Sequence, residues 1–135
     1  MIKRFAVFAF AITLTAGCGD PKFDQYFVQG EQLYATHCSN CHQKDGKGLG
    51  LLYPPVDESD FMEKNFEATL CLMKYGIKGE VVVNGKTFNQ PMPGVRSLTD
   101  LEVAEIATYI YNSGKHKRGL IAVTEAEKIM KDCAQ

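Results

Sequence analysis

The chain has 135 residues, of which 45% are hydrophobic and 23% charged, with 12 glycines, five prolines and no tryptophan. This composition is that of one ordinary globular domain and excludes a disordered, collagen-like or coiled-coil protein. Fifteen Lys and Arg against 16 Asp and Glu leave a formal charge of −1, so no basic field can hold a phosphate backbone and we expect no nucleic-acid partner.

The first residues predict an export signal followed by a lipid anchor. Met1–Arg4 is short and positive, and Phe5–Leu14 is an uncharged apolar run. This run suits the core of a signal peptide but is too short for a membrane-spanning helix, which needs about 20 residues. The segment Leu14-Thr15-Ala16-Gly17-Cys18 resembles a bacterial lipobox, so we expect cleavage before Cys18 and attachment of diacylglycerol to it. The alternative is a standard signal peptide cut near Ala16, with Cys18 a stray thiol.

Residues 24–36 predict a helix that leads into Cys38-Ser39-Asn40-Cys41-His42. Two thiols at this spacing, followed at once by an imidazole, form the arrangement that attaches haem, because each sulfur adds across a vinyl group and the histidine ligates the iron.

Three alternatives to haem attachment are less consistent with the motif. Adjacent Cys41 and His42 are awkward ligands for one tetrahedral zinc ion, and a thioredoxin-like pair opens a helix after a strand instead of following a helix. A simple structural disulfide would leave His42 unexplained. We assign no ligand role to His37 or His116.

Met92 is the favoured candidate for a second axial ligand. It lies in Gln90-Pro91-Met92-Pro93-Gly94, where two prolines fix the backbone and prevent a helix, so a rigid loop can present the thioether to a metal. Its alternative role is that of a gap-filling loop methionine. Met62, Met73 and Met130 lie in helical surroundings that suit core packing.

The remaining elements are predicted from local patterns. Residues 66–75 form a helix with Phe66, Leu70 and Met73 on one face, and 81–88 form two short strands joined by a type I′ turn at Asn84-Gly85.

Two capping boxes predict the last helices. Thr99 and Glu102 open a helix that has Leu101, Ala104, Thr108 and Tyr111 on one face, flanked by Val103, Ile106, Ala107 and Ile110, and that ends at 112–114. Thr124 and Glu127 open another helix over 124–131. Cys71 and Cys133 are left as an even pair in an exported chain, so we expect them to form a disulfide.

Taken in order, CSNCH, YPPVDESDF, MKYGIKGEVVVNGKTFNQPMPG and LTDLEVAEIATYIYNSG make residues 24–114 resemble a monohaem class I c-type cytochrome of the short bacterial kind. The resemblance implies an all-α class I cytochrome c fold wrapped around one covalently bound haem c, with a small β-hairpin before the methionine loop. It implies attachment through Cys38 and Cys41, with His42 as the proximal and Met92 as the distal ligand of the iron.

Two finer details follow from the same resemblance. The carbonyl of Pro54 or Pro55 would accept a hydrogen bond from the proximal histidine. Gly30 and Tyr34 would meet the helix after Thr99 near Tyr109. The expected organisation is a signal peptide (1–17), a lipid-anchored tether (18–23), a cytochrome c domain (24–114) and a C-terminal extension (115–135) with a short helix that is disulfide-linked to the domain.

With both axial positions filled, the iron has no open position for a substrate, so we expect a single-electron carrier and not an enzyme. Its partners would be a redox protein donor and acceptor at a membrane facing the periplasm or cell exterior, with no small-molecule substrate. The alternatives are the haem subunit of a larger redox enzyme, a five-coordinate haem sensor or peroxidase, and an exported lipoprotein with a structural zinc. The run Lys115–Arg118 is either a docking patch or a solvated turn.

Overall fold

The structure is a computed structural model that describes residues 19–133. The predicted signal peptide, the predicted lipidation site Cys18 and the last two residues lie outside the described residues. Within 19–133, no helix combines the length and apolar character needed to cross a membrane.

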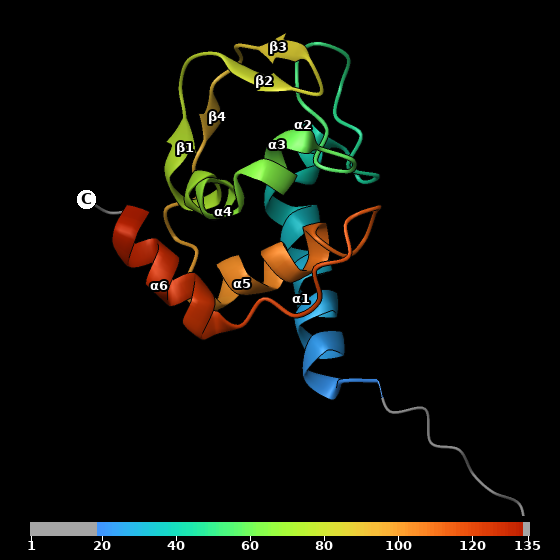
Figure 1. The fold of residues 1–135 in the computed structure, drawn as a ribbon, viewed down its shortest axis with the longest axis vertical. Coiled ribbons are helices and arrows are strands. Elements are labelled where there is room, and N and C mark those ends of the chain that lie inside the picture. Colours follow the sequence, from blue (N-terminus) through green and yellow to red (C-terminus); the bar gives the residue numbers. More distant parts are fainter. Residues whose placement is uncertain (1–18, 134–135) are drawn as a thin grey trace, which may run out of the picture.

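The described chain is mostly helical, with two small antiparallel strand pairs at one end (Figure 1). The elements are α1 (Pro21–His37), α2 (Ser39–His42), α3 (Asp60–Lys64), α4 (Phe66–Tyr75), β1 (Gly76–Ile77), β2 (Val81–Val83), β3 (Lys86–Phe88), β4 (Met92–Pro93), α5 (Asp100–Ile110) and α6 (Val123–Cys133). The hairpin β2–β3 lies on one side of α4, and α5 and α6 lie on the other side (Figure 1). The predicted helical fold with a small hairpin is confirmed.

Helix α1 begins earlier than the predicted residue 24, so the tether before the domain is shorter than expected. Asp20 caps the helix by accepting a hydrogen bond from the Lys22 amide at 3.0 Å, and Pro21 occupies the first turn, where its missing N–H costs nothing. The start of α1 is therefore set by the cap at Asp20 and by Pro21, three residues before the predicted start.

Helices α1 and α5 pack against each other at Gly30. A Cβ placed on Gly30 would collide with the carbonyl group of Glu105 and lie 2.9 Å from the Cβ of Tyr109. One turn later, the ring centroids of Tyr34 and Tyr109 are 5.4 Å apart. The predicted contact of Gly30 and Tyr34 with the later helix is therefore confirmed.

The hairpin and α4 also match their predictions. Helix α4 spans Phe66–Tyr75, and the three apolar residues predicted for its buried face are buried. Strands β2 and β3 pair with Val81 opposite Phe88, and the turn residues Asn84 and Gly85 have φ values of 51° and 73°, as a type I′ turn requires.

Helix α5 is opened by the predicted capping box, in which Thr99 and Glu102 exchange side-chain and backbone hydrogen bonds. Leu101, which shares a face of this helix with Ala104, Thr108 and Tyr111, is 42% exposed. It lies in the first turn of α5, whereas burial begins at Val103, where α5 runs between α1 and α6.

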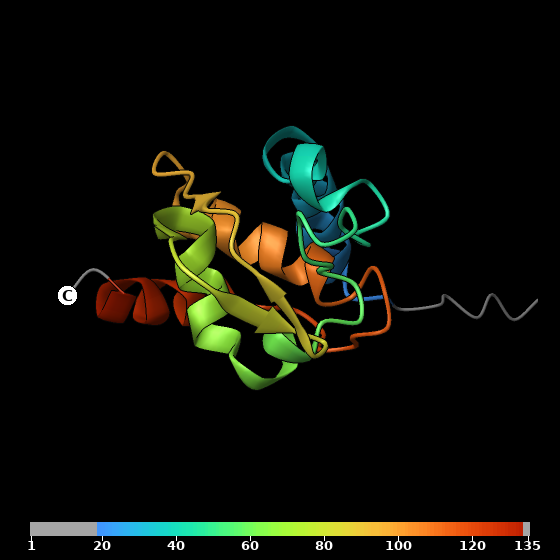
Figure 2. The ribbon, with the colours of Figure 1, turned by 90° about the horizontal axis from the view of Figure 1, so that it is seen from above.

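The C-terminal extension packs α6 against α4 and α5 (Figure 2), with Ala126, Ile129 and Met130 buried. The predicted capping box at Thr124 is wrong, because the helix already begins at Val123. Tertiary contacts position this start instead: Ile121 is fully buried, and its amide donates to the Thr108 hydroxyl on α5 at 3.1 Å.

The sulfur atoms of Cys71 and Cys133 lie within bonding distance, and their Cα atoms are 5.7 Å apart. Disulfides usually have Cα separations of about 4.4–6.8 Å. The geometry of α4 and α6 is therefore compatible with the predicted bond.

Replacing Gly30 by alanine should lower the free energy of unfolding by about 1–3 kcal/mol, the usual cost of overpacking. Helix propensity offers at most about 1 kcal/mol in return, and the new methyl group would meet backbone atoms that cannot rotate away. Denaturant unfolding of the haem-loaded protein measures the change.

Gln29→Ala is the matched control, because Gln29 is exposed on the same helix; its effect should stay within about 0.5 kcal/mol. A Gly30→Ala variant as stable as the wild type would contradict the close contact of α1 and α5.

Candidate haem site

All four predicted site residues line one cavity: Cys38, Cys41, His42 and Met92. The empty space of this cavity, including its open mouth, is about 980 Å³. The fold therefore brings the cysteine–histidine motif and the methionine loop to the same space, although about 50 residues separate them in the sequence.

The attachment motif lies where α1 ends. Helix α1 continues to His37, and the turn α2 follows with the amides of Cys41 and His42 bonded to the Cys38 carbonyl at 3.1 and 3.0 Å. Both cysteines are unbonded, and both face the cavity. Burial raises the pKa of the Cys38 thiol to about 11, and the charge of the neighbouring Cys41 contributes a smaller increase. A thioredoxin-like role is disfavoured, because such a role needs a thiolate near neutral pH.

His42 is held in one orientation and in its neutral form. Its side chain is almost fully buried, and Nδ1 lies 2.9 Å from the Pro54 carbonyl oxygen. A carbonyl can only accept, so Nδ1 carries the proton and Nε2 keeps its lone pair. Burial lowers the pKa of His42, and the bond to Pro54 opposes this effect. The structure thus selects Pro54 over Pro55, and neutral imidazole is the form that binds a metal.

Gly48 allows the Pro54 carbonyl to reach His42. Its φ is +68°, and a Cβ there would collide with the backbone of Tyr53 and Pro54. The Gly48 amide donates to the His42 carbonyl at 3.0 Å, so the loop folds back onto the attachment motif. This role of Gly48 is not apparent from the sequence, because the glycine-rich run alone does not reveal which segment approaches Gly48.

Met92 is fixed by a strand pair that the sequence did not predict. Strand β4 pairs with β1, with Met92 opposite Ile77, and a Cβ on Gly76 would collide with the Met92 carbonyl. The Val95 amide also donates to the Met73 carbonyl at 2.9 Å. Two-residue strands carry no alternation to detect, so only the fold shows that the methionine loop is fastened to the end of α4.

The walls of the cavity are mainly apolar. Helices α4 and α5 contribute Leu72, Met73, Ile106 and Ile110, and the hairpin contributes Val81, Val83 and Phe88. Met62 also lines the cavity, whereas Met130 is a buried residue of α6 and does not line it. The hairpin thus borders the predicted haem site.

The residues present fit an iron porphyrin. Neutral imidazole and thioether groups are ligands of low-spin haem iron, and an apolar wall suits the flat macrocycle. Among residues 19–133, no group of three or more His, Cys, Asp or Glu is arranged to hold a metal ion, so the zinc alternative gains no support from the described part of the chain.

Comparison with known proteins finds one matching family and two similar proteins. The family model described as cytochrome c oxidase, cbb3-type, subunit III matches residues 27–110. Cytochrome c-552 of Thermus thermophilus is 30% identical over 111 residues, covering 77% of this chain and 83% of that protein. A second cytochrome c-552 from the same species has the same identity over 77% of this chain and 74% of its own length. The family match contains the four site residues and ends with α5, before the C-terminal extension.

Proposed function

This chain belongs to the c-type cytochrome family described as cbb3-type cytochrome c oxidase subunit III, and we propose that it carries electrons through a haem held by the Cys38–His42 motif and Met92. It is an electron-transfer protein with covalently bound haem c, and not an enzyme. The observation that supports this ligand set is the meeting of the motif and Met92 in one apolar cavity.

Each proposed ligand has a distinct task. Cys38 and Cys41 would hold the haem covalently through their sulfur atoms, and His42 and Met92 would supply the two protein ligands of its iron. The bound haem supplies one-electron chemistry through its ferric and ferrous states. The Pro54 carbonyl orients His42 and increases its basicity, while the neutral thioether of Met92 favours the ferrous state.

The remaining walls set the conditions for fast electron transfer. Packed apolar side chains exclude water, which also favours the less charged ferrous site. The close backbone contacts at Gly48 and Gly76 hold both ligand loops, so little rearrangement accompanies a change of oxidation state. With His42 and Met92 both bound to it, the iron would keep no position for a substrate.

The partners of such a protein are redox proteins, and we place the exchange at a membrane surface. The lipobox-like segment ending at Cys18 supports this localisation. Helix α1 begins at Pro21, so a lipid on Cys18 would hold the domain within about 10 Å of its anchor, at about 3.3–3.6 Å per extended residue. The domain would face the periplasm or the cell exterior.

A second candidate function is that of a haem subunit in a larger redox enzyme. The family to which the chain belongs favours this function, because it is described as a subunit of an oxidase. Mild detergent extraction of the full chain separates the two: a stable complex of fixed stoichiometry supports the subunit, and a free monomer supports the independent carrier.

The C-terminal extension is fastened to the domain by a disulfide between Cys71 and Cys133. Their Cα separation and the exported nature of c-type cytochromes support this bond. It would join the end of α6 to α4, next to the wall residues Leu72 and Met73.

Met92→Ala should leave the haem covalently attached but remove one axial ligand. The low-spin ferrous spectrum should be lost, exogenous ligands such as cyanide should bind, and the reduction potential should fall, because the thioether no longer favours ferrous iron. Visible spectra and a potentiometric titration measure these changes.

Met62→Leu is the control, since Met62 lines the same cavity but is assigned no bond to iron, and it should keep the low-spin spectrum. A Met92→Ala protein with unchanged spectrum and potential would refute the distal assignment. A high-spin wild type would instead support the sensor or peroxidase.

Cys18→Ser should move the protein from the membrane to the soluble fraction, because each acyl CH₂ buried in the bilayer contributes about 0.8 kcal/mol to binding. Fractionation followed by a haem stain measures this. Cys133→Ser, which leaves the lipobox intact, should stay with the membrane. Wild-type protein found wholly in the soluble fraction would contradict the anchor.

Cys133→Ser should destabilise the protein by about 4 kcal/mol in the chain-entropy model, given a sequence separation of 62 residues. Thermal unfolding of the holoprotein measures the loss, and the haem spectrum should stay the same. The double variant with Cys71→Ser should be no less stable than the single one. Free thiols at both positions, found by mass spectrometry of unreduced digests, would disprove the bond.

A further inference from the structure

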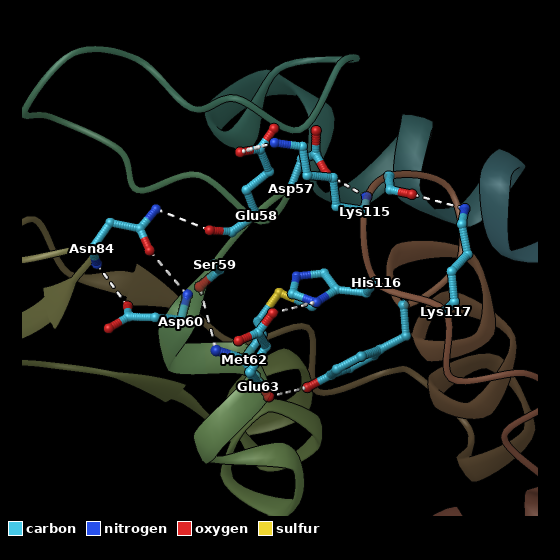
Figure 3. A network of polar contacts seen from close by, with 12 residues as sticks. Asp57, Glu58, Ser59, Asp60, Met62, Glu63, Asn84, Lys115, His116 and Lys117 are labelled. Carbon is cyan, nitrogen blue, oxygen red and sulfur yellow. Dashed lines mark hydrogen bonds and ion pairs between the residues drawn. The ribbon is translucent and has the colours of Figure 1, made fainter.

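His116 lies in a polar network between the C-terminal extension and the segment that leads into α3 (Figure 3). Although its sequence neighbours are lysine residues, its side chain is only 5% exposed. Nδ1 lies 3.5 Å from Glu63 Oε1, and Nε2 is buried with no hydrogen-bond partner within residues 19–133. An unpartnered buried nitrogen costs free energy, so this position calls for a physical reason.

Tyr111 and Met62 connect the imidazole to the haem cavity. Glu63 directly follows Met62, whose side chain lines the cavity. The ring centroids of Tyr111 and His116 are 5.7 Å apart, and the Tyr111 hydroxyl donates to the Met62 carbonyl at 2.9 Å. A charge on His116 therefore acts on the cavity through packed protein of low dielectric and not through water.

Glu63 is the charged group that the imidazole contacts directly. The other charged groups around this segment take part in contacts of their own. Lys115 pairs with Glu58, and Arg118 contacts Glu125 and the Phe66 ring. Lys117 donates to the carbonyls of Asn112 and Gly114, and Asp57 accepts from the Lys115 amide. Burial raises the pKa of Tyr111. A hydrogen bond with Thr69 and the charge of Arg118 lower this pKa, and the charge of Glu67 raises it, so the net shift is upward and the ring stays neutral. A positive imidazole would thus be stabilised chiefly by Glu63.

We propose that His116 is a redox-linked proton site, which binds a proton when the domain gains an electron and releases it when the electron leaves. This inference rests on the proposed function as a haem-bearing carrier. The electron comes from the redox protein that donates it, and the proton comes from solvent. In the neutral ring, Nδ1–H faces Glu63 and Nε2 holds the lone pair, so the incoming proton bonds to Nε2 and forms the imidazolium.

The sign of the coupling follows from charge. One added electron makes the cavity more negative and stabilises the imidazolium, so the reduced protein keeps the proton to higher pH than the oxidised protein. The reduction potential should therefore fall as pH rises through the window in which the imidazole binds and releases this proton, and it should be level on either side of that window.

Spectroelectrochemical titration of the holoprotein at a series of pH values and constant ionic strength tests the proposal. At a fixed electrode potential in the wild type, the ratio of reduced to oxidised protein should fall with rising pH, by at most about tenfold per pH unit, or about 59 mV for one electron. An indicator dye should also show proton uptake on chemical reduction within this window.

Three variants make the test specific. His116→Gln should remove the pH dependence and the proton uptake, and Glu63→Gln should move the fall in potential to lower pH, because the imidazolium loses its partner. The side chain of Glu63 is 65% exposed, so this variant should fold normally. His37→Gln, at an exposed position on α1, should behave as the wild type.

Two results would overturn the proposal: a wild-type potential that does not change across the window, or a pH dependence that persists in His116→Gln. The second result would assign the proton to another group, such as a haem propionate. Reversible reduction with a low-spin spectrum at each pH tests the carrier itself, so a failure of that function is distinguishable from a failure at His116.

Discussion

The close contact of α1 and α5 at Gly30 is the constraint on which the rest of the structure depends. Because Gly30 has no side chain, the two helix backbones approach directly. Helix α1 then delivers the attachment motif at its end, and α5 delivers Ile106 and Ile110 to the cavity wall. The opposite surface of α5 supports the extension through Thr108, which bonds the chain at Ile121. A change in this one helix crossing would alter the cavity and the extension together.

The two sides of the haem cavity are built by the same physical means. On the histidine side, the chain folds closely over Gly48 so that the Pro54 carbonyl reaches His42. On the methionine side, it folds closely over Gly76 so that β4 pairs with β1. In both places, backbone packed on backbone restrains the proposed ligand without an additional side chain. Such rigidity suits electron transfer, in which the site should change little between oxidation states.

The C-terminal extension lies beyond the span matched by the family model, yet it is integrated into the core. It buries Ile121 and α6 against α5 and α4, and it brings His116 next to Glu63. Lys115, Lys117 and Arg118 are exposed, as a solvated turn predicts, and they also contact groups within the molecule. The influence of His116 on the haem would pass through α3 and Tyr111.

The sequence by itself determined the local chemistry of this protein. Spacing and residue type predicted Cys38, Cys41, His42 and Met92 as the residues of the proposed haem site, and they placed the hairpin turn at Asn84 and the helix cap at Thr99. Each of these patterns depends on neighbours a few residues away. Only the tertiary structure decided between Pro54 and Pro55, paired β1 with β4, began α6 at Val123 and buried His116. Each of these depends on contacts between segments distant in the chain, where packing and burial outweigh local preference.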